Sequence, residues 1–183
     1  SKVEHPAIIT PCRNLKKKGA TIIEIPVNSK GELDMDAYAA ALEAPGKKIV
    51  SIMWANNETG VVFPIKQIAQ MAKAAGAVMH TDAVQAVGAM PVHPAALGVD
   101  ALSLSGHKLG APKGSGALWL RRGAALEPLV HGGGQERGRR SGTENVAAAV
   151  GLATAVRLAT GPEREAERTA LADARDAFVR EVL

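Results

Sequence analysis

The stretch that decides the fold is Asp100–Gly116, DALSLSGHKLGAPKGSG. It begins with apolar Leu102 and Leu104 alternating with small residues, which is typical of a short β-strand. The strand pattern breaks at Gly106, and Lys108 follows two residues later. A lysine in a glycine-rich turn at a strand end can be held close to a ligand, where desolvation or a nearby cation favours the neutral, nucleophilic amine. Taken alone, such a lysine is more often a solvated turn residue.

The rest of the chain alternates strand-like and helix-like segments. We expect strands over residues 21–27, 48–54 and 77–81, and helices over residues 6–18, 34–43, 65–75 and 145–160. In the helix 65–75, the spacing of the apolar residues predicts an inward face formed by Ile65, Ile68, Ala69 and Ala72. This alternation predicts βαβ units and a largely parallel sheet. Only ten residues separate Ser105 from Gly116, too few for a helical crossover, so residues 117–121 are expected to pair antiparallel. The predicted fold is α/β with three layers, a mostly parallel mixed sheet with helices on both faces.

Polar residues follow the ends of three predicted strands. Asn57 comes after the run 48–54, which reads as a strand buried on both faces, and Asp82 follows 77–81. Ser105–Lys108 follows the strand of the opening stretch. Ligands of parallel sheets bind beyond the carboxyl ends of the strands, so these residues form a candidate site. For Asp82 the alternative is an ordinary cap of a following helix.

Composition narrows the class of protein. The 183 residues are 46% hydrophobic and 22% charged, and no apolar run approaches the length of a membrane span. We expect a cytoplasmic protein with no membrane partner. The single cysteine, Cys12, excludes an intrachain disulfide framework and lies on an apolar helical stripe, which predicts a packed structural thiol.

The net charge of +4 leaves two kinds of partner open. Part of the excess lies in Arg137, Arg139 and Arg140. A basic balance can indicate nucleic acid, but no nucleic-acid-binding motif accompanies it, and an anionic cofactor or substrate explains the arginines equally well. We expect no nucleic-acid partner and no metal site.

Four segments together carry a resemblance to a known family. They are IMWANNETG (52–60), MHTDAVQ (79–85), SLSGHKLGAPKG (103–114) and HGGGQERGRRSGT (131–143). In this order they resemble the cysteine desulfurases, class V aminotransferase-like enzymes that use pyridoxal 5′-phosphate (PLP). The resemblance runs from about His5 to Ala159. It implies the large-domain architecture of fold-type I PLP enzymes, a homodimer, L-cysteine as substrate, and a sulfur-acceptor or scaffold protein as partner in iron–sulfur or thio-cofactor assembly.

The resemblance assigns four residues to the cofactor's ring and aldehyde. Lys108 is expected to bind the aldehyde covalently, and Asp82 to pair with the protonated ring nitrogen. Asn57 and Gln85 are expected to hydrogen-bond the phenolate oxygen. Gln85 lies three residues after Asp82 and faces the same way if a helical turn begins there.

Four further residues are assigned to the phosphate and the ring face. Ser105 and His107 match phosphate contacts, and Thr143 matches a residue that reaches the phosphate of the neighbouring subunit. His5 matches the residue that stacks over the ring and shuttles protons. From the sequence alone, His5 followed by proline is equally a helix-start histidine.

The family also uses parts that have no match here. These are a cysteine on a mobile loop that takes up the sulfur as a persulfide, an arginine for the substrate carboxylate and a Gly/Thr phosphate loop. Cys12 matches no family nucleophile. We expect residues 1–160 to form the central part of a PLP-binding large domain and 161–183 to begin a helix leading to a further domain. This last helix is expected to carry an apolar stripe of Leu171, Ala174, Phe178 and Val182. The isolated chain is expected to be inactive.

Two other functions stay open at this level. One is another class V PLP enzyme, such as a selenocysteine lyase or an aminotransferase. The other is a basic α/β module without catalytic activity that binds an anionic partner or nucleic acid in a salt-sensitive manner.

Overall fold

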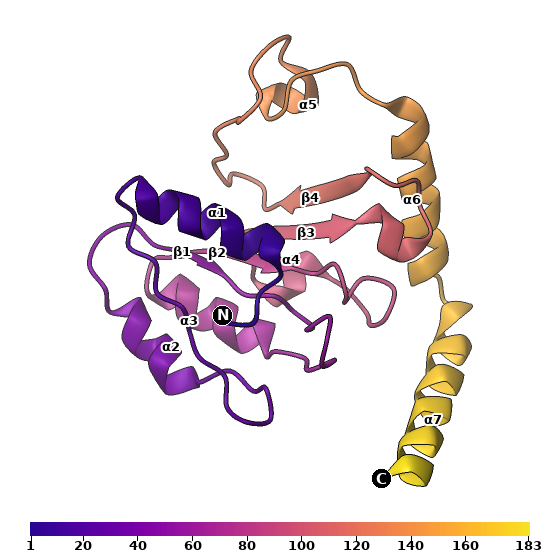
Figure 1. Ribbon diagram of the computed structural model, residues 1–183. Coiled ribbons are helices and arrows are strands. Elements are labelled where there is room, and N and C mark those ends of the chain that lie inside the picture. Colours follow the sequence, from indigo (N-terminus) through magenta and orange to yellow (C-terminus); the bar gives the residue numbers. More distant parts are fainter.

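The computed structural model describes residues 1–183 and is built around a four-stranded sheet (Figure 1). In spatial order, its strands are β1 (Ile49–Ser51), β2 (Val78–Asp82), β3 (Ala101–Ser105) and β4 (Gly116–Leu120). The first three are parallel, and β4 pairs antiparallel with β3. The mixed, mostly parallel sheet is confirmed, including the direction of the fourth strand, because the short connection before it can only turn back.

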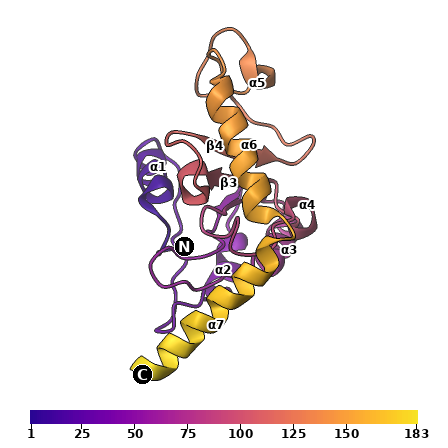
Figure 2. The ribbon, with the colours of Figure 1, turned by 90° about the vertical axis from the view of Figure 1, so that its right-hand side faces the viewer.

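Helices lie on both sides of this sheet. Helix α1 (Pro6–Lys17) lies on one side, whereas α3 (Ile65–Ala74) and α4 (Pro94–Leu97) lie on the other (Figure 2). Helix α2 (Met35–Leu42) joins the α3 side, where the hydroxyl of Tyr38 donates to the carbonyl of Ile68 at 2.9 Å. The three-layer arrangement is therefore confirmed.

The main core lies between the sheet and α3. The stripe expected on this helix is fully buried, and its members are Ile65, Ile68, Ala69 and Ala72. They belong to a core cluster of 19 residues that also contains Met79 of β2 and Leu102 of β3. Aliphatic and alanine side chains supply most of this core, which fixes β2 and β3 beneath α3 and sets where their carboxyl ends lie.

Side-chain caps define the starts of three helices. His5 Nδ1 accepts from the Ala7 N–H at 3.1 Å, next to Pro6 at the first position of α1. Asp34 caps α2 in the same way, and Asn145 caps α6 (Val146–Thr160) through the Ala148 N–H. Each cap satisfies an N–H that the helix itself leaves unpaired.

The C-terminal part of the chain comprises α5 (Gln135–Gly138), α6 and α7 (Arg164–Val182). Helix α6 packs on the 3-10 helix η1 (Gly106–Leu109), and α7 then extends away from the sheet (Figure 1). The apolar stripe predicted on α7 is exposed, with Leu171 at 72% and Phe178 at 66%. The domain boundary expected at residue 160 stays a prediction.

Three local predictions are wrong. Residues 21–27 form no strand, since only Val27 makes an isolated bridge to Leu33. β1 is shorter than expected, and the burial expected along 48–54 holds only beyond it: Ile49 is 80% exposed, whereas Ile52 and Met53 are each 2% exposed. Helix α1 has no fully buried residue, so Cys12 is only partly buried rather than a packed core thiol. None of the helices combines the length and apolar character needed to cross a bilayer.

Candidate active site

The loops that follow the three parallel strands β1, β2 and β3 all begin at the carboxyl ends of these strands, on the same side of the sheet. Beyond β1, the Trp54 N–H donates to the Asp82 carbonyl at 2.8 Å, and beyond β2, the Ala83 N–H donates to the Ser103 carbonyl at 2.9 Å. These bonds continue the parallel pairing to the last residues before the loops. The segments that carry Asn57, Gln85 and Lys108 therefore start side by side, as the topology predicted.

Asp82 is the last residue of β2 and only 8% exposed. Its Oδ1 accepts from the Val84 N–H at 2.9 Å, and it takes part in none of the chain's ion pairs. A single helical turn follows, closed by the Val87 N–H on the Ala83 carbonyl at 3.0 Å, so the turn expected beneath Gln85 is present. A buried carboxylate without a protein cation is costly and suits a cationic group of a ligand.

Lys108 lies on η1, immediately after β3. The turn is tight at Gly106, where a Cβ would overlap the Ser115 hydroxyl and lie 3.0 Å from the Ala111 Cβ. The main-chain N–H of Gly106 donates to the Ser115 carbonyl at 2.9 Å. Lys108 itself is exposed and forms no ion pair within the chain, so its side chain is available to a ligand.

The two predicted phosphate contacts are joined to each other. Ser105 Oγ lies 2.8 Å from His107 Nδ1, and the imidazole is exposed. One hydrogen bond fixes the ring and leaves Nε2 for a further partner. A hydroxyl and an imidazole N–H, beside the backbone of a turn, are suitable donors for an anion.

His5 and Asn57 line a common hollow of about 510 Å³ between the N-terminal segment and the loop after β1. His5 uses Nδ1 for the helix cap, so Nε2 is the nitrogen available to a ligand. The helix-start interpretation is thus confirmed and leaves the predicted role of the second nitrogen open.

Two buried polar residues that the sequence reasoning missed shape this hollow. Glu4 accepts the Met53 N–H with both carboxylate oxygens, at 2.9 and 3.0 Å, and so ties the segment before His5 to the end of β1. Asn56 donates to the Val3 carbonyl at 3.0 Å and accepts two N–H groups of the following loop. Only the tertiary pairing of these segments reveals either role.

Thr143 does not join the strand-end group. It is exposed, in the loop between α5 and α6. Figure 1 shows α5 and the chain around it above β4. This loop has contacts of its own: Gly142 donates to Gln135 Oε1 at 2.9 Å, and the Ser141 N–H donates to the Val130 carbonyl at 3.1 Å. The contact of Thr143 with the phosphate bound by a neighbouring subunit stays a prediction.

The structure adds His80, a half-buried histidine of β2 that the sequence reasoning did not consider. Its Nδ1 lies 2.8 Å from Ser51 Oγ, and its Nε2 lies 3.2 Å from Ser103 Oγ. Burial lowers the pKa of His80, and the negative charges of Asp82 and Glu4 act in the opposite direction. The ring is therefore neutral near pH 7.

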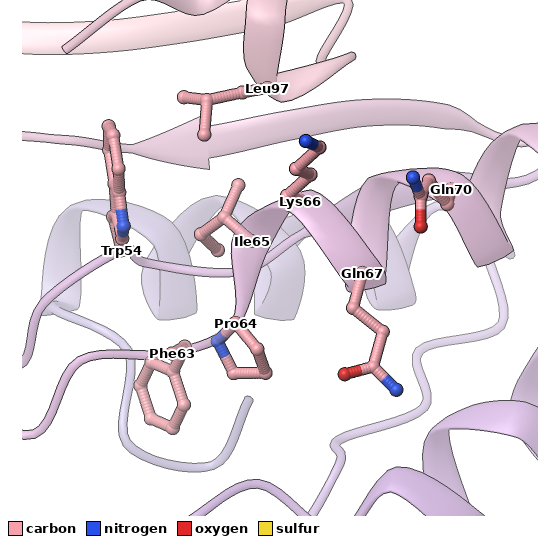
Figure 3. A pocket seen from close by; sticks show the side chains of 8 residues that line it. All are labelled: Trp54, Phe63, Pro64, Ile65, Lys66, Gln67, Gln70 and Leu97. Carbon is pink, nitrogen blue, oxygen red and sulfur yellow. The ribbon is translucent and has the colours of Figure 1, made fainter.

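A second hollow, of about 460 Å³, lies away from these residues at the start of α3 (Figure 3). Its lining residues are Trp54, Phe63, Pro64, Ile65, Lys66, Gln67, Gln70 and Leu97. None of the predicted site residues lines it, and Lys66 is its single titratable group. The strand-end group is the better candidate for chemistry because it combines an amine, a carboxylate and imidazoles.

The geometry defines a strand-end ligand site in an open α/β sheet. The chain belongs to the class-V aminotransferase family, whose sequence model matches residues 1–177. It is 52% identical over 169 residues to a cysteine desulfurase of Cereibacter sphaeroides, covering 92% of this chain and 43% of that protein. It is 56% identical over 160 residues to a cysteine desulfurase of Gluconacetobacter diazotrophicus, covering 87% of this chain and 40% of that protein.

A solved structure has the same fold. The X-ray structure of a NifS-like protein from Rickettsia africae superposes with a TM-score of 0.80 at 38% identity, over 87% of this chain and 44% of that one. The resemblance to cysteine desulfurases is confirmed, and the chain spans less than half the length of the relatives it matches.

Proposed function

We propose that this chain supplies most of the cofactor-binding part of a PLP-dependent cysteine desulfurase, an enzyme that removes sulfur from L-cysteine and releases alanine. The observation that carries the proposal is Asp82, a buried carboxylate without a protein cation at the end of β2. Identity above 50% to cysteine desulfurases supports this substrate over those of other class-V enzymes.

The side chains at the strand ends fit the groups of PLP. Asp82 suits the protonated ring nitrogen, and Lys108 suits the aldehyde. The amides of Asn57 and Gln85 can donate to the phenolate oxygen. PLP supplies an electron sink for charge that develops on the substrate.

Two more donors and a stacking residue complete the proposed set. Ser105 and His107, held together at 2.8 Å, would bind the phosphate. His5 would cover the ring face and move protons through Nε2, the nitrogen that its helix cap leaves available. Thr143 would reach the phosphate of a second copy of the chain, which makes the proposed enzyme a homodimer.

The sulfur itself needs a nucleophile that we do not assign to this chain. Cys12 lies on α1 and is not proposed for this role. The sulfur would pass as a persulfide to an acceptor or scaffold protein in iron–sulfur or thio-cofactor assembly, in the cytoplasm.

The test is made on the complete protein encoded by the gene. We expect it to bind PLP with a visible absorbance band and to release alanine and, with a thiol reductant, sulfide from L-cysteine. A protein that binds PLP but releases selenide only from selenocysteine, or transfers an amino group to a keto acid, would be another class-V enzyme. A protein that binds no PLP would contradict the proposal.

A further inference from the structure

One face of the sheet carries a compact polar group. Successive residues of a strand point to opposite faces, so Met79 and Thr81 face the core, where they are 1% and 0% exposed. His80 and Asp82 share the other face. In the register, Ser51 of β1 lies beside His80, and Ser103 of β3 lies beside Asp82.

His80 is held from both sides in this group. Its Nδ1 is 2.8 Å from Ser51 Oγ and its Nε2 is 3.2 Å from Ser103 Oγ, so three adjacent strands fix one imidazole ring. A neutral imidazole has one donor and one acceptor, and a serine hydroxyl can serve either. Two hydroxyls therefore satisfy a neutral ring completely without supplying a charge.

We propose that His80 is a positioning residue for Asp82. The hydroxyls of Ser51 and Ser103 hold a neutral imidazole on the face of the sheet that carries Asp82, so that the Asp82 carboxylate remains available to a cationic group of the ligand. The inference rests on the proposed function, in which that group is the protonated ring nitrogen of PLP. It adds a residue that contacts neither PLP nor substrate in the proposed site.

The charges around His80 explain why neutrality matters. Asp82, two residues along β2, and Glu4, from the segment before α1, are the charged groups that act on His80, whereas β1 and β3 contribute only the two hydroxyls. Burial has the largest effect and lowers the pKa of His80, whereas each carboxylate favours the protonated ring and acts to raise it. A protonated His80 would be an internal cation competing with the ligand for Asp82.

This competition predicts a specific pH dependence. The affinity for PLP should fall as the pH drops through the lowered pKa of His80, because the new cation weakens the pairing of Asp82 with the ring nitrogen. His5, His107 and the phosphate of PLP also belong to the proposed site, so the part of the pH dependence due to His80 is taken as the difference between matched variants.

The experiment measures the Kd of PLP for the complete protein between about pH 5 and pH 8, where histidine changes charge. The variants are His80→Gln, which keeps a neutral polar side chain, and His93→Gln as control, since His93 is exposed and makes no side-chain cap. We expect His80→Gln to lose part of the acid-side weakening of PLP binding that both the wild type and His93→Gln retain. NMR signals of the histidine rings in the protein without PLP give an independent measure, and His80 should stay neutral at pH values where an ordinary histidine is protonated.

The outcomes separate the two proposals. A wild type that binds no PLP contradicts the proposed function and this inference with it. A wild type that binds PLP with the same pH profile as His80→Gln contradicts the inference alone. Should His80→Gln not fold, Ser103→Ala removes one of the two hydroxyls that hold the ring and should weaken PLP binding by up to about 10-fold, the limit reached if the whole free energy of one hydrogen bond is lost from binding. Unchanged binding in Ser103→Ala would then overturn the inference.

Discussion

The main-chain N–H of Trp54 donates to the carbonyl oxygen of Asp82 at 2.8 Å, three residues beyond the end of β1. This bond extends the pairing of β1 and β2 to the last residue before each loop. The loop that carries Asn57 and the turn that carries Gln85 consequently leave the sheet from the same place. The proposed grouping of these two amides with Asp82 depends on it.

Asp82→Asn should leave the fold intact and reduce turnover of the complete protein on the order of 10²-fold or more, equivalent to about 2.7 kcal/mol or more of transition-state stabilisation. The asparagine keeps an oxygen for the Val84 N–H but has no charge for the ring nitrogen. The check is steady-state alanine release, with far-UV circular dichroism for the fold. Asp173→Asn on α7 is the control, since Asp173 is exposed. Near-normal turnover of Asp82→Asn would remove the ring-nitrogen role.

Gly106→Ala should destabilise the turn that presents Lys108 by about 1–3 kcal/mol, the usual cost of overpacking. The added Cβ meets the Ser115 hydroxyl and the Ala111 Cβ, and the Ser115 carbonyl at 3.0 Å cannot move without losing its bond to the Gly106 N–H. Denaturant unfolding of Gly106→Ala and of the wild type measures the change, and equal stability of the two would refute the steric explanation.

Acid should destabilise the folded protein partly through His80. Its pKa in the folded state lies below the ordinary value of 6.5. As the pH falls through about 6.5, the unfolded chain therefore takes up a proton that the folded chain does not, and the free energy of unfolding decreases until the folded pKa is reached. Urea unfolding at several pH values should give a shallower acid slope for His80→Gln than for the wild type. Equal slopes would show that burial does not keep His80 neutral.

Tyr38 should titrate only at strongly alkaline pH. Burial raises its pKa from 10.0 to about 12, while its hydroxyl donates to the Ile68 carbonyl in the core. The folded tyrosine stays neutral where an unfolded one ionises, so its contribution to stability is complete below about pH 10 and is lost as the pH rises toward 12. The tyrosinate absorbance difference between the wild type and Tyr38→Phe measures this pKa. A midpoint near 10 would mean that the side chain is accessible to water.

The sequence predicted the parts of the fold that depend on local pattern and on connection length. The spacing of Ile65, Ile68, Ala69 and Ala72 identified the buried face of α3, and ten residues between Ser105 and Gly116 required an antiparallel return. The strand predicted over residues 21–27 was wrong. β-branched residues favour an extended backbone but do not supply a neighbouring strand, and here the segment makes only one isolated bridge.

The candidate site was predictable only in outline. Strand ends are visible in the sequence, so Asn57, Asp82 and Lys108 could be grouped before the structure was known. The two serine contacts of His80 could not be predicted, because they depend on the register of three strands that are distant along the chain. Glu4 was missed for a similar reason, since its partner, the Met53 N–H, is 49 residues away.

The central claim is that Lys108 binds the cofactor. Borohydride reduction of the complete protein with bound PLP, followed by peptide mapping, should place the reduced cofactor on Lys108, and Lys108→Ala should lose both the label and turnover. Label on Lys113, the other lysine of this turn, or undiminished labelling in Lys108→Ala, would contradict the account.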